Sequence, residues 1–591
     1  MRRETRMLRF VLVAAAGLAA CRPAKCLDVW WHLSMGKAAF EHRALSFPDP
    51  VGPDPGALYV DPEWTFDLLV LGLYELGGMG LILAAVGVLA ALSGWAMLRL
   101  AESLVKDPWA ALGLAALGVA GVSYRFAARP QSFFLVLLPL VIWLARERRW
   151  LPLFGLGLFW SQSHSSFVLA PFVMLGAAWP LTRRDWPLLL LLPLPLVGPF
   201  GLEIIDQVLT HSSVEGIEDM SPADASWFWP PGLVGSGRSL APLILELQLV
   251  VGAFGLVRIW RDPSRWLGPF ALALLGLALS LTAVRFFAAA TVLALPFAAQ
   301  GLALGSRGRW WALLLVPVLP YLFWAGGPRL APVAGELPFG VESRLPEGLI
   351  FNDYDSGGYL GWQGPARVFI DGRTPVHFDE VWFARADEAT RLPEAFFALD
   401  QQWGFDGAVV PKRAPLCEAL DARWGAVWSG EAVALFLPGR ASALRGACEG
   451  ISGSLARCEP AHREAWLGEL SAVDGPYARR VEAALLLECG VARPDEARRA
   501  LELATEQDPD SPDLPWLRAV LALREGDEDA LWYWLDQAGD GAEPLMLRLA
   551  LLEALGDEED LQRELERAER ILVPPPSSLV ELRGRHPAPS R

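Results

Sequence analysis

Residues 80–98 read GLILAAVGVLAALSGWAML, a stretch without a charged side chain. The hydrocarbon core of a bilayer requires about 17–25 mainly apolar residues from each helix that crosses it. The polar gap that follows holds Arg99 and Lys106, and a second apolar stretch begins at residue 107. This alternation of long apolar stretches with short polar gaps is typical of membrane-spanning helices.

The alternation continues through the first half of the chain and predicts an α-helical polytopic membrane domain of about eleven spans. Runs such as 188–192 and 310–316 leave no polar face for water, which argues against a soluble helical protein. Hydrophobic residues make up 53% of the chain and charged residues 20%, as this class requires. The expected spans are 8–20, 80–98, 107–123, 131–145, 150–163, 167–181, 186–200, 241–258, 266–284, 286–304 and 310–326.

Basic residues fall in every second gap, and this pattern predicts the orientation of the spans. Lys and Arg concentrate in cytoplasmic loops. The N-terminus is basic and is expected in the cytoplasm, whereas the alternate loops are acidic or neutral and are expected outside. The basic gaps hold Arg99, Lys106, Arg146, Arg148, Arg149, Arg183, Arg184, Arg258, Arg261, Arg265, Arg307 and Arg309.

Residues 8–20 are short for a span and follow a basic segment, as in a signal peptide. Residues 18–21, Leu-Ala-Ala-Cys, also resemble a bacterial lipobox, so a retained first helix and lipoprotein processing both remain open. Either reading places Cys21 outside. The other cysteines also fall on the predicted outer side, where disulfides form, and none has metal-ligand spacing. Pairing of Cys448 with Cys458 is one option, but sequence does not set connectivity.

Beyond the membrane domain, expected over 1–326, the chain is no longer continuously apolar. Residues 326–591 hold 46 acidic and 27 basic residues, so most of the net charge of −16 lies there and no basic nucleic-acid footprint exists. Strands are expected at 349–354, 366–370, 407–411 and 432–437, with helices at 388–403 and 416–424. This alternation predicts a small α/β domain over 327–440.

A helical region is expected over 441–573, followed by a disordered tail over 574–591. Its alanine-rich helices are separated by breaks such as Asp508-Pro509, and they resemble tetratricopeptide repeats, which stack helix pairs. A plain helical cap is the alternative. The expected helices are 495–506, 516–524, 530–538, 544–555 and 558–572.

The first outer loop gathers ionisable side chains next to the membrane, where charges usually serve a site. Asp28 and His32 are four residues apart, as are Glu63 and Asp67, so helices would place each pair on one face. Carboxylates beside an imidazole could provide a general base. The alternative is an interfacial loop anchored by its tryptophans.

Further candidates lie at the outer ends of later spans. The planar guanidinium of arginine suits phosphate oxygens, although arginines also reach for lipid headgroups. Acids beside glycine at two strand ends of the α/β domain could bind a sugar or a cation, or form turns only. These candidates are Arg125, Arg129, His164 and Arg285 near the membrane, and Asp353, Asp355, Asp371 and Arg373 in the α/β domain.

Several of these motifs together resemble bacterial membrane proteins related to the C-type glycosyltransferase fold. The first is Asp28-Val-Trp-Trp-His32-Leu with Gly36, followed by Trp64 and Asp67. The others are 128–133, Ala-Arg-Pro-Gln-Ser-Phe; 285–288, Arg-Phe-Phe-Ala; 352–360, Asn-Asp-Tyr-Asp-Ser-Gly-Gly-Tyr-Leu; and 369–373, Phe-Ile-Asp-Gly-Arg. The resemblance spans roughly residues 20–440.

This resemblance implies an enzyme of the bacterial inner membrane, with its C-terminal region in the periplasm, that takes a sugar from a polyprenyl-phosphate donor. Asp28 would be the base that activates the acceptor, with Asp67 or Glu63 as second choice. Arg129 and Arg285 would hold the donor phosphate. Relatives often carry Asn-x-His-Gly where this chain has Ser163-His164-Ser165, so a divalent cation is not a certain cofactor.

Two other roles remain open. A non-catalytic assembly protein would recruit periplasmic protein partners through acidic surfaces of its helical C-terminal region. A transporter would carry charges within several spans, and Glu246 is the one clear acid inside an expected span. The donor sugar, the acceptor and the oligomeric state lie beyond the sequence.

Overall fold

A computed structural model describes the chain in two compact units. Unit 1 is Met1–Val333 with Glu347–Ala389, and unit 2 is Ala334–Pro346 with Thr390–Arg591. The described residues are 2–21, 27–191, 193, 241–255, 263–302, 315–324, 338, 341–373, 378, 380–412, 414–429, 433–440, 448, 483, 486, 494–507, 514–538, 542–555 and 558–571. The expected tail at 574–591 lies outside them.

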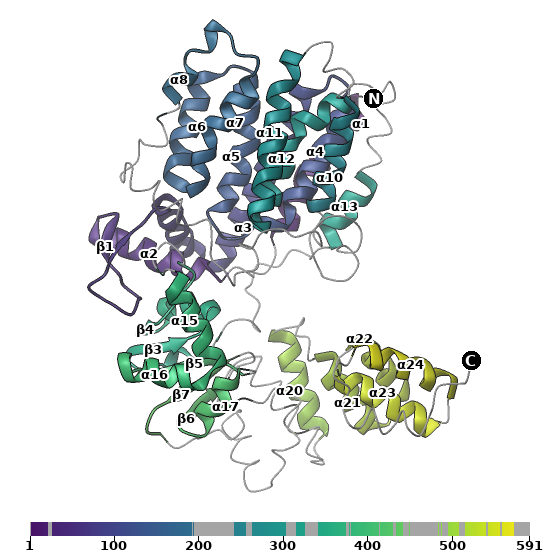
Figure 1. Ribbon diagram of the computed structural model, residues 1–591. Coiled ribbons are helices and arrows are strands. Elements are labelled where there is room, and N and C mark those ends of the chain that lie inside the picture. Colours follow the sequence, from purple (N-terminus) through teal and green to yellow (C-terminus); the bar gives the residue numbers. More distant parts are fainter. Residues whose placement is uncertain are drawn as a thin grey trace. The chain divides into compact units, whose positions relative to one another are not determined.

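Unit 1 is mainly a bundle of apolar helices that run side by side (Figure 1). A helix occurs at each described part of the expected spans, because those stretches are apolar and their breaks coincide with polar or proline residues. The bundle helices are α1 (Arg2–Ala20), α3 (Trp64–Leu104), α4 (Pro108–Val122), α5 (Gln131–Arg146), α6 (Trp150–Ser163), α7 (Ala170–Ala178), α8 (Leu188–Leu191), α10 (Ala241–Gly255), α11 (Pro263–Thr282), α12 (Phe287–Leu302) and α13 (Leu315–Trp324).

The helix α3 is longer than the expected span 80–98 and begins at Trp64. It is broken at Gly77 and Gly78, where Gly78 has φ 63° and ψ −162°, a combination that only glycine adopts readily. The break divides α3 into a segment that carries Asp67 and a long apolar segment. Within the described residues, two helical stretches are long and apolar enough to cross a membrane, Trp64–Leu104 and Val284–Leu302.

Small residues let the bundle helices approach closely. A Cβ on Gly17 of α1 would lie 3.0 Å from the backbone oxygen of Gly87 of α3. A Cβ on Gly121 of α4 would lie 2.5 Å from the hydroxyl of Thr291 of α12. Such contacts are typical of helices packed inside membranes. They bring α1 against α3 and α4 against α12.

Unit 1 also contains the elements that build the candidate site. The helix α2 (Val29–His42) and the strands β1 (Ser46–Pro48) and β2 (Leu58–Val60) lie at one end of the bundle (Figure 1). The strands β1 and β2 are antiparallel, with Ser46 opposite Val60. The strands β3 (Gly348–Asn352) and β4 (Ala366–Val368) are parallel, with Gly348 opposite Ala366. Between them, α14 (Tyr354–Gln363) packs against α2.

The expected helix 388–403 is wrong, since the structure has two helices there. These are α15 (Glu380–Arg391) and α16 (Pro393–Trp403). Leu392 between them is extended, with φ −118° and ψ 106°. Proline disfavours helical backbone at the residue before it, so Pro393 ends one helix and begins the next.

Unit 2 contains a three-stranded part in which β7 pairs with two neighbours. The strand β7 (Val433–Leu437) is antiparallel to β5 (Gly407–Pro411) and to β6 (Gly425–Ser429). The sequence predicted β5 and β7 but missed β6, which carries an irregularity between Ala426 and Trp428. The helix α17 (Pro415–Asp421) precedes β6.

The remaining helices of unit 2 lie where the sequence predicted them. They are α20 (Pro494–Gln507), α21 (Leu514–Glu525), α22 (Glu528–Gln537), α23 (Ala542–Leu555) and α24 (Glu558–Ile571). Buried alanines and leucines of α20 and α21 form one core, and those of α23 and α24 form another. Their likeness to tetratricopeptide repeats stays a prediction.

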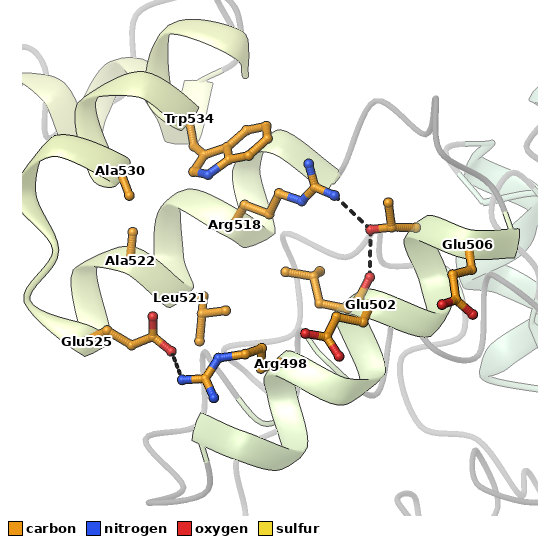
Figure 2. A pocket seen from close by; sticks show the side chains of 11 residues that line it. Arg498, Glu502, Glu506, Arg518, Leu521, Ala522, Glu525, Ala530 and Trp534 are labelled. Carbon is orange, nitrogen blue, oxygen red and sulfur yellow. Dashed lines mark hydrogen bonds and ion pairs between the residues drawn. The ribbon is translucent and has the colours of Figure 1, made fainter.

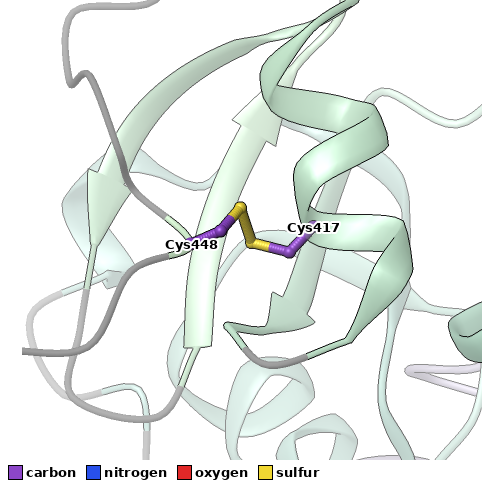
Figure 3. The surroundings of a disulfide bond; sticks show 2 residues. All are labelled: Cys417 and Cys448. Carbon is purple, nitrogen blue, oxygen red and sulfur yellow. A yellow bond between two sulfur atoms is a disulfide. The ribbon is translucent and has the colours of Figure 1, made fainter. Parts of the chain in front are cut away.

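The disulfide differs from the option raised by the sequence. Cys448 pairs with Cys417 of α17 rather than with Cys458 (Figure 3). The two Cα atoms are 5.6 Å apart, although 31 residues separate them in sequence. The sequence suggested Cys448 with Cys458 because these two cysteines are close along the chain. In the structure, α17 brings Cys417 next to Cys448 instead. Cys458 lies outside the described residues.

Candidate functional site

Asp28 pairs with an arginine that follows it by about a hundred residues. Asp28 caps the start of α2, and its Oδ2 lies 2.7 Å from Nε of Arg129. Arg129 stands in the turn between the short helix η1 (Ser123–Arg125) and α5. The side chains are 22% and 28% exposed, so a molecule arriving from solvent can reach both. The fold therefore brings Asp28 and Arg129 together.

His32 and Asp67 form a second, deeper pair. Nδ1 of His32 lies 2.6 Å from Oδ1 of Asp67, and both side chains are buried. Burial, followed by the charges of Arg129 and His164, lowers the pKa of His32 well below its usual value. The imidazole is therefore neutral at pH 7, and one proton lies between its Nδ1 and the carboxyl oxygen of Asp67. This bond joins α2 to the start of α3.

Asp61 is a further buried acid near this pair, and the sequence analysis did not select it. Its Oδ1 accepts from the backbone N–H of Glu63 at 3.1 Å. It also lies within electrostatic range of Asp67. Burial raises the pKa of Asp61 to about 7. His32 and Asp67 are joined by their short bond, and Asp61 adds a third buried ionisable side chain to this part of the site.

Glu63 caps the start of α3 and lies within electrostatic range of the first pair. Loss of water contact raises its pKa to about 8, and the negative charges of Asp61 and Asp28 add to this effect. Arg129 and Arg285 oppose it. Glu63 is therefore mostly protonated at pH 7, whereas Asp28 forms the ion pair with Arg129.

The proton on Glu63 predicts a pH-dependent stability. Its folded pKa of about 8 lies above the ordinary 4.5, so its contribution to stability is complete below about pH 4.5 and is lost as the pH rises through about 8. We expect Glu63→Gln to exceed the wild type in unfolding free energy by on the order of 1–3 kcal/mol near pH 8.5, and by much less near pH 5. Unfolding in mixed detergent micelles measures this difference. Parallel pH curves for the two proteins would contradict it.

The other membrane-edge candidates differ in their surroundings. His164 accepts a hydrogen bond at Nδ1 from the backbone N–H of Ser166 at 3.0 Å, and its ring stacks on Phe134. Arg125 donates to Oε1 of Gln131 at 2.7 Å. Arg285, in the short helix η9 (Val284–Phe286), lies over the ring of Phe286 with 5.3 Å to the centroid. Arg285 also lies within electrostatic range of Glu63.

The motif at 352–355 connects the strand β3 to the site. Asn352 donates from Nδ2 to the carbonyl oxygen of Ile370 at 2.7 Å and accepts at Oδ1 from Phe369 N–H at 2.9 Å. Loss of water contact raises the pKa of Asp353 to about 6. Asp355 is exposed. Tyr354, which the sequence did not single out, lies within electrostatic range of Asp28 and Arg129.

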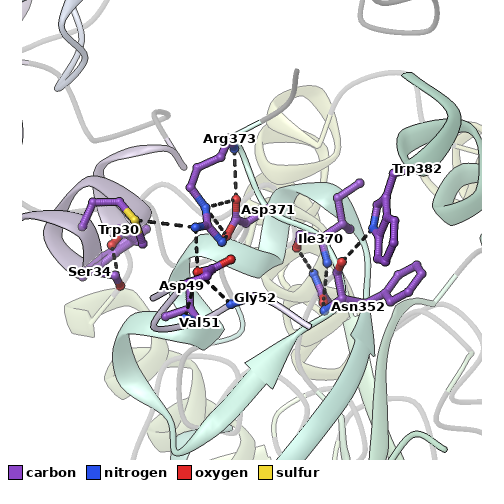
Figure 4. Close-up of polar contacts among 12 residues, drawn as sticks. Trp30, Ser34, Asp49, Val51, Gly52, Asn352, Ile370, Asp371, Arg373 and Trp382 are labelled. Atoms are coloured by element: carbon purple, nitrogen blue, oxygen red, sulfur yellow. Dashed lines mark hydrogen bonds and ion pairs between the residues drawn. The ribbon is translucent and has the colours of Figure 1, made fainter. Parts of the chain in front are cut away.

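Asp371 and Arg373 form a buried ion triad with Asp49, which the sequence also missed (Figure 4). Nη2 of Arg373 lies 2.7 Å from Oδ2 of Asp371, and Nη1 lies 2.8 Å from Oδ1 of Asp49. Asp49 also accepts from the backbone N–H of Val51 and Gly52. All three charged side chains are fully buried. Their expected role as ligands for a sugar or a cation stays a prediction, and the geometry assigns them a structural one.

The described part of the chain contains no group of three or more His, Cys, Asp or Glu residues arranged to hold a metal ion. Asp28 itself is paired with Arg129. A divalent cation as cofactor stays a prediction from the resemblance alone.

Comparison with known proteins gives matches among solved structures. The arabinofuranosyltransferase AftD from Mycobacteria is similar with a TM-score of 0.44 and 14% identity, over 74% of this chain and 40% of that chain. An oligosaccharyltransferase from Archaeoglobus fulgidus in the apo form is similar with a TM-score of 0.43 and 11% identity, over 69% of each chain. This chain thus spans less than half the length of AftD. No family model and no curated protein matches it.

Proposed function

We propose that this protein is a membrane glycosyltransferase that moves a sugar from a polyprenyl-phosphate donor to a periplasmic or cell-envelope acceptor. The observation that carries this proposal is the Asp28–Arg129 ion pair. Its two side chains are partly exposed, and Oδ2 of Asp28 lies 2.7 Å from Nε of Arg129. Arg285 lies within electrostatic range of Glu63, as Asp28 and Arg129 do. A carboxylate suits removal of a proton from an acceptor. Guanidinium groups suit the negative charge of a leaving phosphate.

Residence in a bilayer is part of this proposal. Large apolar side chains of the bundle are exposed, among them Phe10 at 74%, Leu151 at 83% and Phe254 at 69%. Exposed apolar area on this scale suits lipid rather than water. The basic gaps place α2 and the hairpin β1–β2 on the outer side. In a bacterium that side is the periplasm, where unit 2 would then also lie.

The proposed reaction inverts the anomeric carbon of the sugar. The acceptor oxygen or nitrogen attacks that carbon, and the bond from the carbon to the donor phosphate breaks. The acceptor proton passes to Asp28. Arg129 and Arg285 hold the phosphate that departs with the electron pair of the broken bond. His32 and Asp67 hold α2 against α3 through their bond of 2.6 Å, and Asp28 stands at the start of α2.

The test uses the full chain reconstituted in proteoliposomes. Undecaprenyl-phosphate hexoses and pentoses labelled in the sugar are the donors, and envelope extract supplies the acceptors. We expect labelled sugar to move from one donor of the panel to a lipid-free or polymeric product. Empty liposomes are the control. Absence of transfer from every donor, by protein shown to be folded, would contradict this function.

A groove in unit 2 favours a second candidate, a scaffold that recruits an extended protein segment. A cavity of about 470 Å³ lies among α20, α21 and α22 (Figure 2). Arg518 covers the ring of Trp534 at 4.4 Å and donates to Thr505, whereas Arg498 pairs with Glu525. If Trp534→Ala abolished the envelope function of the full chain and Asp28→Asn preserved it, this scaffold would replace the enzyme.

A further inference from the structure

The turn at residues 371–373 touches the carboxylate of Asp28. A Cβ added to Gly372 would lie 2.7 Å from Oδ1 of Asp28 and 2.6 Å from Nε1 of Trp31. Both distances are shorter than any ordinary contact of a methyl group. A methyl group at residue 372 would therefore displace the carboxylate of Asp28 or the indole of Trp31. Because Oδ2 of Asp28 faces Arg129 at 2.7 Å, the carboxylate is held between the turn and the arginine.

Buried charges fix this turn from behind. Arg373 donates from Nε to both oxygens of Asp371, at 2.9 and 3.0 Å, and from Nη1 to Asp49 at 2.8 Å. Its guanidinium also lies over the rings of Tyr59 and Phe378. Bonds of the planar guanidinium to two carboxylates leave little freedom of rotation. The turn is thereby tied to the hairpin β1–β2.

Asn352 fixes the turn from the strand side (Figure 4). It bonds to the carbonyl oxygen of Ile370, the residue before Asp371, and to the N–H of Phe369. A Cβ on Gly357 of α14 would lie 1.9 Å from the same carbonyl oxygen. Both ends of the turn are therefore held by contacts that a small displacement would break.

We propose that residues 371–373 position Asp28, with Gly372 as the contacting surface and Arg373 as the residue that holds it. The inference rests on the proposed role of Asp28 as base. It assigns the 369–373 motif to positioning rather than to a sugar or a cation, since its charges are consumed within the buried triad. A reacting group misplaced by about 1 Å costs on the order of 100-fold in rate, so the effect should be large.

The experiment compares Gly372→Ala with Gly361→Ala in the full chain. Gly361 lies in the helix α14, and a Cβ there would meet Val51 at 3.0 Å rather than Asp28. We expect Gly372→Ala to lower kcat by about 10- to 100-fold while KM for the donor changes less than about threefold. Gly361→Ala should keep kcat, even if its thermal stability falls as much. Equal losses of kcat in the two variants, or wild-type kcat in Gly372→Ala, would overturn the positioning role.

Two further variants separate this inference from the proposed function. Asp28→Asn tests the base itself, so an active Asp28→Asn contradicts the function whatever Gly372→Ala does. An inactive Asp28→Asn beside a fully active Gly372→Ala contradicts the positioning role alone. If Gly372→Ala does not fold, Arg373→Lys replaces it, because lysine keeps the charge but loses the planar fork. We expect about a tenfold lower kcat from Arg373→Lys, and an unchanged kcat in folded protein would overturn the inference.

Discussion

Replacement of Asp28 by asparagine is expected to lower sugar transfer by about 10²- to 10⁴-fold, the range that a general base contributes. Asparagine has nearly the same shape, but its amide cannot take a proton from an acceptor. Glu63 does not replace Asp28 near pH 7, because its pKa of about 8 keeps it mostly protonated. The fall should therefore appear in kcat, measured with the labelled donor in proteoliposomes.

Protein stability should change little in the same variant. Asp28 and Arg129 are partly exposed, and ion pairs of this kind contribute at most about 1 kcal/mol. The matched control is Glu41→Gln, which neutralises an exposed carboxylate near the other end of α2. Transfer by Asp28→Asn at the rate of Glu41→Gln would contradict the assignment of the base.

The helices of unit 1 were predictable because apolar length is a local property of sequence. Each described part of an expected span is helical. The error in α3 has a physical cause, since the span was counted from residue 80 and the helix begins at Trp64. Its first turns carry Glu63 and Asp67 at the start of a mixed polar and apolar segment, which a search for uninterrupted apolar residues passes over.

The sequence predicted which residue types form the site, but it did not predict which side chains pair with each other. Spacing of four residues placed Asp28 and His32 within one turn, and the backbone bond from His32 N–H to the Asp28 oxygen agrees. Their side chains nevertheless pair with different residues, Arg129 and Asp67. Spacing along a helix indicates a shared face, whereas the partner depends on which segments pack there.

Asp49, Asp61 and Tyr354 were missed for a related reason. Asp49 meets Arg373 across 324 positions of sequence, and nothing near residue 49 marks it as more than a turn acid. Gly372 of the 369–373 motif was noticed in the sequence, but its role was not predicted. Glycine there suggested a tight turn, whereas the structure shows that the backbone of Gly372 lies close to the carboxylate of Asp28.

Replacement of Arg373 by methionine is expected to destabilise unit 1 by about 3–5 kcal/mol, because it leaves Asp371 and Asp49 buried without their counter-charge. The triad is fully buried, so water does not screen it. Unfolding in mixed detergent micelles measures the loss. The matched control is Arg367→Met on β4, whose guanidinium donates to the carbonyl oxygen of Pro53 and whose loss should cost about 1 kcal/mol.

The origin of this loss can be separated from packing. If unpaired charge causes it, the triple variant Asp49→Asn, Asp371→Asn, Arg373→Met should recover part of the stability, since no buried charge remains. If the volume and shape of Arg373 matter instead, the triple variant should be no more stable than Arg373→Met. A loss for Arg373→Met no larger than that of Arg367→Met would contradict the structural role of the triad, because a buried arginine between two carboxylates cannot be removed at the cost of one neutral hydrogen bond.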